Sequence, residues 1–318
     1  MNRRIGLIAG AALAVMAAPA QAQEPLFDGC PSDQIRARFA EFGETGRMPA
    51  DLGAWLNDPE AQQVTPWAAF DNVDYVGVCW VSAWLVHTDE GSVLIDTLYG
   101  PFTDTLIDNV AQTGTDLADI RYVLMTHGHF DHVGGAAALK PLLPNAIFVM
   151  TQEGWAEAAE DAAASVGGPR EWAMIAPELQ ATDGQRIELG GNTFTVLETP
   201  GHTWGTASYL FDVTDGEDAH RAITIGGLGL NAIEGPEQVQ TYLDSVDRLR
   251  AMITDPQHSV EVHLPGHGFS ANLPEDRERL KAREPGEPHV LVNQDGLVSQ
   301  IDFLRDRAAA RLAVEQGQ

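Results

Sequence analysis

The chain has 318 residues, of which 44% are hydrophobic, and its 46 acidic residues against 19 basic ones give a formal net charge of −27. This length and apolar content allow a large buried core, which argues against intrinsic disorder. The negative charge repels nucleic acid and anionic membranes, so we expect a small-molecule substrate instead. Composition leaves the oligomeric state open.

The first 22 residues have the pattern of a secretory signal peptide. Arg3 and Arg4 precede an apolar run from Ile5 to about Ala18, and the small-residue triplet Ala20-Gln21-Ala22 follows. The apolar run is short for a bilayer span, which disfavours the alternative of a membrane anchor. We therefore predict cleavage after Ala22, a periplasmic or secreted location, and one domain over residues 23–318 that is free of the membrane.

Hydrophobic periodicity in the remaining chain predicts strands and helices in alternation. Helices are predicted over residues 32–42, 102–113, 134–143, 152–164, 236–253 and 297–314. Strands are predicted over residues 73–78, 81–88, 92–97, 120–126, 146–150, 186–189, 192–197, 207–211 and 223–225, with a strand-plus-turn at 260–268. The first three strands form a meander that ends at Asp96, and Gly190-Gly191 is a two-residue hairpin signal. The loop 166–180 carries Trp172 and Met174, which either pack into the core or line a substrate groove.

The densest cluster of reactive side chains is THGHFDHVGG, residues 126–135, directly after the apolar run Tyr122 to Met125. Four candidate metal ligands fall within six positions there: His127, His129, Asp131 and His132. Imidazole and carboxylate groups suit Zn²⁺. Two clusters, one of two histidines and one of Asp131 with His132, can point at neighbouring positions in space. Each cluster still needs further donors for four-coordination, so the rest of the chain must supply more histidines.

Two Pro-Gly-His turns supply them. His202 lies in ETPGHTWG and His267 in HLPGHG, each at the end of a predicted strand, where a rigid sheet can position a ligand. His263 competes with His267, but it occupies an alternating strand position that could face the core, whereas glycines flank His267. The other histidines lack such a context and are predicted to be structural: His87, His220, His258 and His289.

Cys30 and Cys79 would both remain after cleavage, in a compartment that permits disulfides. Cys79 lies in a strand-like run and could equally be a small buried hydrophobic residue. The sequence leaves both interpretations open.

The motifs THGHFDH, TPGHT and PGHG, in this order and at these separations, resemble the metallo-β-lactamase superfamily over nearly all of the mature chain. The resemblance implies an α/β fold, a four-layer αβ/βα sandwich, with a dinuclear zinc site at the sheet edges. By motif, one zinc would take His127, His129 and His202, and the other would take Asp131, His132 and His267. Several stretches are similar, more narrowly, to the third subclass of class B β-lactamases: DNVDYVGVCWVSAWLVHTDEGSVLIDT, VGG, TPGHTWGTAS and TYLDSVDRLRAM.

This resemblance implies a secreted zinc-dependent hydrolase that opens the β-lactam ring of antibiotics by metal-bound hydroxide. Zinc lowers the pKa of bound water to about 7 and polarises the attacked carbonyl, and Asp131 would orient the hydroxide. The chain contains no G-x-S-x-G motif that would indicate a serine nucleophile. Two alternatives stay open: a zinc hydrolase of another ester, lactone or thioester, and a zinc-binding protein with little catalysis.

One departure from the resembling proteins bears on this choice. Many thioesterases and lactonases of the superfamily carry an aspartate that bridges both metals, and Gly227 stands where it would be expected, which favours the β-lactamase branch. The next residue is Leu228, where other β-lactamase subclasses carry a cysteine and the third commonly a serine. We interpret Leu228 as an apolar wall beside the second zinc, with Asn231 as a weak polar substitute. The alternative is that Leu228 packs into the sheet.

Overall fold

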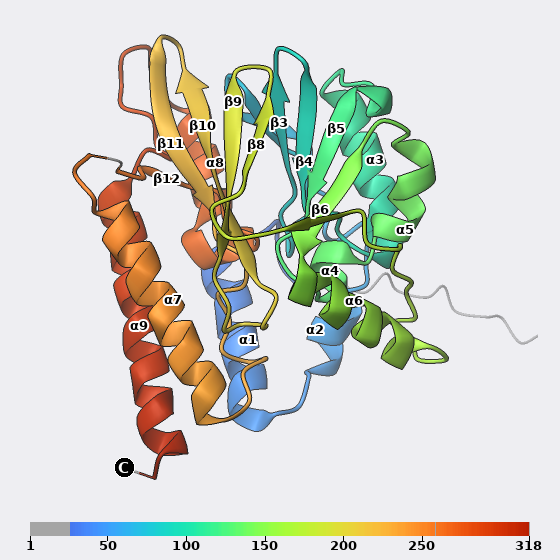
Figure 1. Cartoon of the computed structure of the whole chain (residues 1–318), viewed down its shortest axis with the longest axis vertical. Helices are drawn as coiled ribbons and strands as arrows, with labels where there is room; N and C mark the ends of the chain where they lie inside the picture. Colours follow the sequence, from blue (N-terminus) through green and yellow to red (C-terminus); the bar gives the residue numbers. More distant parts are fainter. Residues whose placement is uncertain (1–25, 258, 318) are drawn as a thin grey trace, which may run out of the picture.

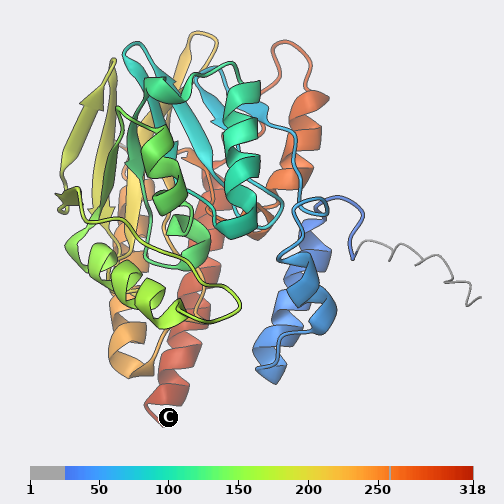
Figure 2. The same cartoon turned by 90° about the vertical axis from the view of Figure 1, so that its right-hand side faces the viewer.

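The computed structural model describes residues 26–257 and 259–317 of the chain. The predicted signal peptide, residues 1–22, lies outside them. Two β-sheets pack face to face, and helices cover their outer faces, as Figures 1 and 2 show. The predicted four-layer αβ/βα sandwich is therefore confirmed. No helix within the described residues combines the length and the apolar character that a bilayer span requires.

The first sheet contains seven strands in the order β1-β2-β3-β4-β5-β6-β7. Their bounds are β1 Trp67–Phe70, β2 Val73–Tyr75, β3 Trp84–Thr88, β4 Gly91–Ile95, β5 Ile120–Leu124, β6 Ile147–Thr151 and β7 Leu179–Ala181. Strands β1 to β4 pair antiparallel, which confirms the meander. Strand β5 lies between two parallel neighbours, β4 and β6, and this explains its nearly continuous apolar run.

The second sheet contains five strands in the order β12-β11-β10-β9-β8. Their bounds are β8 Arg186–Leu189, β9 Asn192–Glu198, β10 Ala207–Asp215, β11 Asp218–Thr224 and β12 Val262–His263. The predicted hairpin joins β8 to β9, and Gly190 and Gly191 both adopt positive φ angles, 48° and 84°. A two-residue hairpin turn of this type requires that conformation, which glycine adopts without steric cost.

Nine helices lie in the described part of the chain, and three apolar clusters join the layers. The helices are α1 Ser32–Thr45, α2 Ala50–Trp55, α3 Thr103–Gln112, α4 Phe130–Val133, α5 Ala136–Leu139, α6 Gln152–Ser165, α7 Gly235–Ile253, α8 Leu273–Lys281 and α9 Gln294–Glu315. One cluster packs the first sheet against α3, α5 and α6, a second fills the space between the sheets, and the third packs the second sheet against α7 and α9. Figure 1 shows α7 and α9 side by side on that outer face.

The predicted helix over residues 134–143 is wrong. The helical turn α4 begins earlier, at Phe130, and the chain then forms the short helix α5 and a 3-10 turn over Lys140–Leu142. Pro141 lies at the start of that turn and cannot donate a backbone hydrogen bond, so a continuous helix is disfavoured there. A Cβ on Gly135 would lie 2.3 Å from the Thr97 carbonyl oxygen, which shows how closely this turn packs on the end of β4.

Five further elements differ from the prediction. Helix α8 was not predicted, because its sequence LPEDRERLK is mostly charged and has no apolar period. Helix α2 and strand β1 lie in a stretch predicted to be irregular, and β7 lies at the end of the predicted loop 166–180. Helix α9 is predicted to lie on the surface, but it buries an apolar stripe against α7: Leu297, Ile301, Leu304 and Ala308.

Cys30 and Cys79 form a disulfide, with their Cα atoms 5.4 Å apart. The bond ties the segment before α1 to the segment between β2 and β3. This decides between the two interpretations that the sequence left open. The bond also links the N-terminal helices α1 and α2 covalently to the first sheet, in addition to the chain connection that leads from α2 to β1.

Replacing Cys30 and Cys79 together by serine should lower the free energy of unfolding by about 2–4 kcal/mol, because 49 residues separate them and the unfolded chain gains freedom without the bond. Urea unfolding monitored by tryptophan fluorescence measures this. Reductant should destabilise the wild type and leave the double variant unchanged; equal midpoints for all samples would contradict the bond's role.

Candidate metal centre

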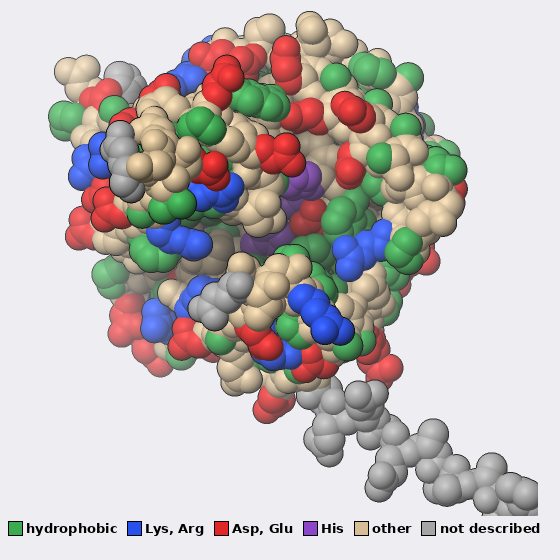
Figure 3. Space-filling view, turned by 90° about the horizontal axis from the view of Figure 1, so that it is seen from below, with side chains coloured by type: hydrophobic (Ala, Val, Ile, Leu, Met, Phe, Trp, Pro, Cys, Tyr) green, Lys and Arg blue, Asp and Glu red, His purple; other side chains and the backbone are tan. Residues whose placement is uncertain are grey.

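The predicted ligands converge at one edge of the sandwich. His127 and His129 follow β5, and Asp131 and His132 belong to the short helix α4 that comes next. His202 follows β9 in the second sheet. His267 follows β12 of the same sheet and precedes a 3-10 turn. Figure 3, which views this edge, shows histidine side chains at the bottom of a hollow. The two sheets therefore place six side chains from distant parts of the sequence around one opening.

The first group consists of His127, His129 and His202. The Nδ1 atom of His129 lies 3.1 Å from Nε2 of His127 and 3.1 Å from Nε2 of His202. His127 and His202 are buried, and His129 is partly buried. Three imidazole nitrogens thus face one another from two different sheets, in an arrangement that could hold a metal ion.

The second group consists of Asp131, His132 and His267. The Nε2 atoms of the two histidines are 3.2 Å apart, and Oδ2 of Asp131 lies 3.5 Å from each of them. The group adjoins the first one, since the ring centroids of His127 and His132 are only 4.2 Å apart. The two groups therefore share one opening, as a dinuclear site requires.

Four of the five histidines direct Nε2 into the groups, and each has a partner for the outward Nδ1 atom. These partners are Oγ1 of Thr126 for His127 at 3.0 Å, Oδ2 of Asp96 for His132 at 2.7 Å, the Gly229 carbonyl for His202 at 2.6 Å and the Trp80 carbonyl for His267 at 2.9 Å. Hydrogen bonds at the outer nitrogen fix the orientation of a histidine ring and the tautomer that leaves the inner nitrogen free to ligate. These contacts favour metal binding over a purely structural cluster.

Burial lowers the pKa of four of the five histidines. It lowers the pKa of His202 to about 3, with the neighbouring His129 adding to the effect, and it lowers the pKa of His127 and His129 as well. Burial also lowers the pKa of His267 to about 4. Imidazoles that stay neutral near pH 7 are in the form that binds a metal.

At the other two ligands, His132 and Asp131, the charges of neighbouring residues outweigh the effect of burial on the pKa. Burial disfavours the charged form of His132, but the carboxylates of Asp131 and Asp96 raise its pKa above the usual value. Burial likewise disfavours the Asp131 carboxylate, but His132 and His267 lower its pKa. Asp131 therefore remains ionised.

The donor set fits zinc. Five imidazoles and one carboxylate provide nitrogen and oxygen ligands, and each group leaves room in its coordination sphere for a water or a substrate atom, as a catalytic zinc site does. The outward hydrogen bonds described above supply the supporting contacts that such sites need.

The remaining histidines lie outside both groups. His263 belongs to β12, and its Nδ1 lies 3.0 Å from Oε1 of Gln300 in α9. Burial lowers the pKa of His263 to about 4. His87 contacts Asp74, His220 contacts Glu261, and His289 stacks on Phe70. His258 lies outside the described residues. The structure therefore places His267, and not His263, in the second group.

Gly227 packs directly against the first group. It has a φ angle of 62°, and a Cβ atom there would lie 2.3 Å from Cδ2 of His202. A side chain at this position, including a metal-bridging aspartate, would have to displace the His202 ring. The observed position of the His202 ring therefore requires a glycine at residue 227.

The interpretation of Leu228 as a wall beside the second metal is not supported. Leu228 is partly buried and packs against the cluster between the second sheet and helices α7 and α9. Its carbonyl accepts a hydrogen bond from the Tyr242 hydroxyl of α7. The alternative interpretation, packing against the fold, agrees with these contacts. Asn231 is exposed and lies against Gly229, because its Oδ1 is 2.2 Å from where a Cβ on Gly229 would stand.

Two residues that support the site were not identified from the sequence. Asp96 was predicted only as the end of a strand, and Trp80 was not singled out. A buried acidic residue at the end of an apolar strand is the signal that could have pointed to Asp96. Trp80 could not have been found, because it acts through its backbone carbonyl and any residue has one.

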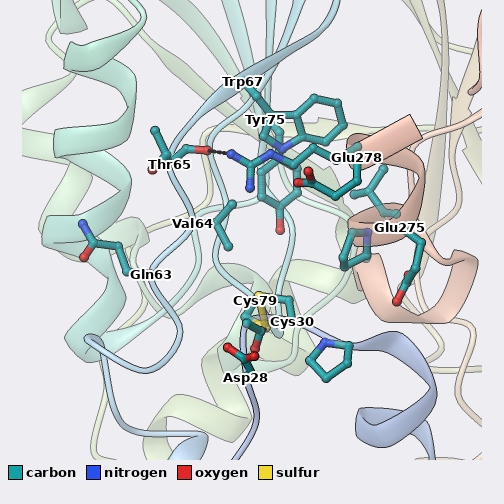
Figure 4. A pocket seen from close by; sticks show the side chains of 16 residues that line it. Asp28, Cys30, Gln63, Val64, Thr65, Trp67, Tyr75, Cys79, Glu275 and Glu278 are labelled. Carbon is teal, nitrogen blue, oxygen red and sulfur yellow. Dashed lines mark hydrogen bonds between the residues drawn. A yellow bond between two sulfur atoms is a disulfide. The ribbon is translucent and has the colours of Figure 1, made fainter. Parts of the chain in front are cut away.

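A separate cavity of about 440 Å³ lies between the Cys30–Cys79 disulfide, strands β1 and β2, and helix α8. Figure 4 shows Trp67 and Tyr75 at one end of the cavity and the disulfide at the other. The carboxylates of Glu275 and Glu278 in α8 lie along its side. The six residues of the two groups do not line this cavity, so it is distinct from the metal centre.

Comparison with known proteins agrees with this geometry. The chain matches the family described as "Metallo-beta-lactamase superfamily" over residues 76–214. A hydroxyacylglutathione hydrolase of Acidiphilium cryptum (strain JF-5) is 34% identical over 247 residues, which cover 73% of this chain and 88% of that protein. Another, from Bradyrhizobium sp. (strain ORS 278), is 29% identical over 63% of this chain and 70% of its own length. Some curated relatives are matched over much less, down to 26% of their length.

Solved structures with the same fold include metallo-β-lactamases. One from Cronobacter sakazakii, described by a HARLDQ motif, has a TM-score of 0.71 and 27% identity, with 85% of this chain and 95% of that chain covered. BJP-1, a subclass B3 metallo-β-lactamase of Bradyrhizobium japonicum, has a TM-score of 0.69 and 24% identity, with 80% and 96% covered. The second likeness concerns the fold alone. The chain belongs to the metallo-β-lactamase superfamily.

Metal analysis of purified variants tests the ligand assignment. We expect two zinc ions in the wild type and about one in Asp131→Ala and in His267→Ala, because each substitution removes a donor from the second group. His263→Ala should retain two, since His263 lies outside both groups, and it serves as the matched control. Loss of zinc from His263→Ala with full content in His267→Ala would reverse the assignment.

Gly227→Ala should reduce the zinc content of the first group, because its Cβ would overlap the His202 ring. Gly184→Ala is a matched control: Gly184 has a φ angle of 75°, but nothing lies within 4 Å of its Cβ position. Both variants carry the backbone strain of a non-glycine residue at positive φ, about 1–2 kcal/mol. Equal zinc content and equal melting temperatures in the two variants would contradict the overlap.

Proposed function

We propose that this chain is a zinc-dependent hydrolase that opens the β-lactam ring. The observation that carries the proposal is the packing of Gly227 on His202, which leaves no space for a carboxylate to bridge the metals at that position. A bridging aspartate accompanies thioesterase and lactonase activity in many resembling proteins. Its replacement by a glycine in close contact favours the β-lactamase branch of the superfamily.

The chain's own residues would hold the metals and orient the reactants. Zinc in such a site polarises a carbonyl and lowers the pKa of a water molecule. The His127, His129 and His202 imidazoles form one pocket for an ion, and Asp131 with His132 and His267 forms the other. No side-chain nucleophile is required in this scheme.

Asp131 has a second role in addition to binding. Its carboxylate stays ionised because two imidazoles offset the effect of burial on its pKa. Only Oδ2 is engaged with His132 and His267, at 3.5 Å from each. The carboxylate can therefore accept a hydrogen bond from a water molecule in the opening and orient it toward a substrate carbonyl.

We also propose that the protein is exported to the periplasm or secreted. The predicted signal peptide supports this, and so does the Cys30–Cys79 disulfide, because disulfides persist in oxidising compartments and are rare in the cytosol.

Thioester hydrolysis is the second candidate. Curated relatives are named hydroxyacylglutathione hydrolase, and one of them is matched over 88% of its length at 34% identity. The two groups of ligands suit carbonyl chemistry of either kind. The residues around them must therefore decide the substrate.

A panel of three substrates separates the candidates. The zinc-loaded protein should hydrolyse a chromogenic cephalosporin faster than a lactone or a thioester, and a chelator should abolish the activity until zinc is restored. Hydrolysis of the thioester alone would support the second candidate. Full zinc content without any turnover would indicate a zinc-binding protein with little catalysis.

A further inference from the structure

Arg170 stands beside the metal centre. It lies in the segment between α6 and β7, and its guanidinium carbon is 5.2 Å from the centroid of the Phe130 ring. Phe130 is the first residue of α4 and stands between His129 and Asp131 in the sequence. A cation stacked on an aromatic face is attracted to the ring and keeps its outer edge free for hydrogen bonds. Arg170 thus presents a positive charge over the first residue of α4, the helix that carries Asp131 and His132.

The segment that carries Arg170 is anchored. The backbone amide of Trp172 donates a hydrogen bond to Oγ of Ser165 at 3.1 Å, and the Ser165 hydroxyl donates to the Trp172 carbonyl at 3.3 Å. The side chains of Trp172 and Met174 are partly buried and pack against the cluster beneath the first sheet. These two residues therefore act as core anchors. The position of Arg170 is set by them on one side and by α6 on the other.

The charge of Arg170 has no carboxylate partner among the described residues. The surroundings of the first group are acidic, because Glu157 and Asp161 both act on His129, and the chain as a whole carries −27. Basic side chains lie at the rim of the hollow in Figure 3. An anionic substrate would be repelled by the acidic side and attracted to an unpaired guanidinium.

On the opposite wall Arg311 is already engaged, because it donates to the Leu230 carbonyl and pairs with Glu315. Gly227 and Gly229 contribute only backbone there, and Leu228 packs against the apolar cluster of α7 and α9. The wall beside the second group is aromatic: Trp80 lies with its ring centroid 5.6 Å from that of His267 and 6.2 Å from that of Phe130. Among the described residues, the two groups thus have beside them an arginine without a carboxylate partner and an aromatic surface.

We infer that Arg170 binds the carboxylate of the substrate, which is an acyl compound with an apolar portion and a free carboxylate group. The inference rests on the proposed hydrolase function and specifies its substrate class. The guanidinium pairs with the carboxylate at the rim, the apolar portion lies on Phe130 and Trp80, and the scissile carbonyl reaches the two groups of ligands. Arg170 determines specificity through binding and takes no part in bond cleavage.

The test varies the charge of the residue and of the substrate together. The variants are Arg170→Gln and Arg170→Lys, with Arg186→Gln as the control, since Arg186 is an exposed arginine of the β8–β9 hairpin whose loss changes the net charge equally. The substrates are a chromogenic cephalosporin acid and its methyl ester, each measured with zinc-loaded protein. A carboxyl-bearing thioester and an uncharged thioester form a second pair.

Arg170→Gln should raise KM for each acid about tenfold, the effect expected from losing one charged hydrogen bond, and should leave kcat nearly unchanged. KM for the methyl ester and for the uncharged thioester should not change. Arg170→Lys should restore part of the affinity, and Arg186→Gln should behave as the wild type. Equal changes for acid and ester, or none for either, would overturn the inference.

A binding measurement keeps this result separate from the proposed function. If the zinc-loaded protein hydrolyses none of the four compounds, the proposed function fails, and calorimetric titration with the same acids and esters then decides about Arg170. About tenfold weaker binding of the acids to Arg170→Gln, without change for the esters, would sustain the carboxylate site. Unchanged binding with a lowered melting temperature would show that Arg170 only stabilises the loop through Phe130.

Discussion

The buried carboxylate of Asp96 connects the two groups of ligands. Its Oδ2 accepts hydrogen bonds from Nδ1 of His132 at 2.7 Å and from the Thr126 hydroxyl at 3.0 Å, and its Oδ1 accepts one from the Thr126 amide at 2.8 Å. The same hydroxyl lies 3.0 Å from Nδ1 of His127. Asp96 has a left-handed backbone, with φ of 63°, and its amide donates to the Leu124 carbonyl at the end of β5. One carboxylate thus orients a histidine of each group and joins them to the ends of two parallel strands.

The comparisons point to two activities, and the residues around the two groups of ligands, more than the ligands themselves, bear on the choice between them. Hydroxyacylglutathione hydrolases and metallo-β-lactamases both resemble this chain, and the six clustered side chains suit the chemistry of either. Two features of this chain lie beside the six side chains: Gly227 excludes a side chain next to His202, and Arg170 stands over Phe130. The contacts that select a substrate in such a fold lie in loops held by rigid sheets. These contacts can change with little effect on the stability of the fold.

Much of the fold and of the candidate site could be predicted because the signals are local. The apolar run of β5, the Gly-Gly hairpin and the long amphipathic α7 are each decided by neighbouring residues, and the structure contains all three. The helix predicted over residues 134–143 failed, because Pro141 and the packing of Gly135 on Thr97 interrupt it. Helix α8 has no apolar period, and its signals are of another kind: a proline and acidic residues in its first turn and basic residues in its last.

Residue types and spacing by themselves determined which side chains could ligate a metal, because a dense histidine-aspartate motif and two Pro-Gly-His turns are rare combinations at strand ends. Only the tertiary structure decided how they meet: His202 and His267 arrive from a different sheet. His263 belongs to β12 and contacts Gln300 of α9, whereas His267 lies in the turn after β12 and reaches the second group. The same holds for Cys30 with Cys79, for Asp96 beneath His132 and for Arg170 above Phe130. Each of these pairs is distant in sequence, and packing of the two sheets, which no local pattern encodes, sets the distance between them.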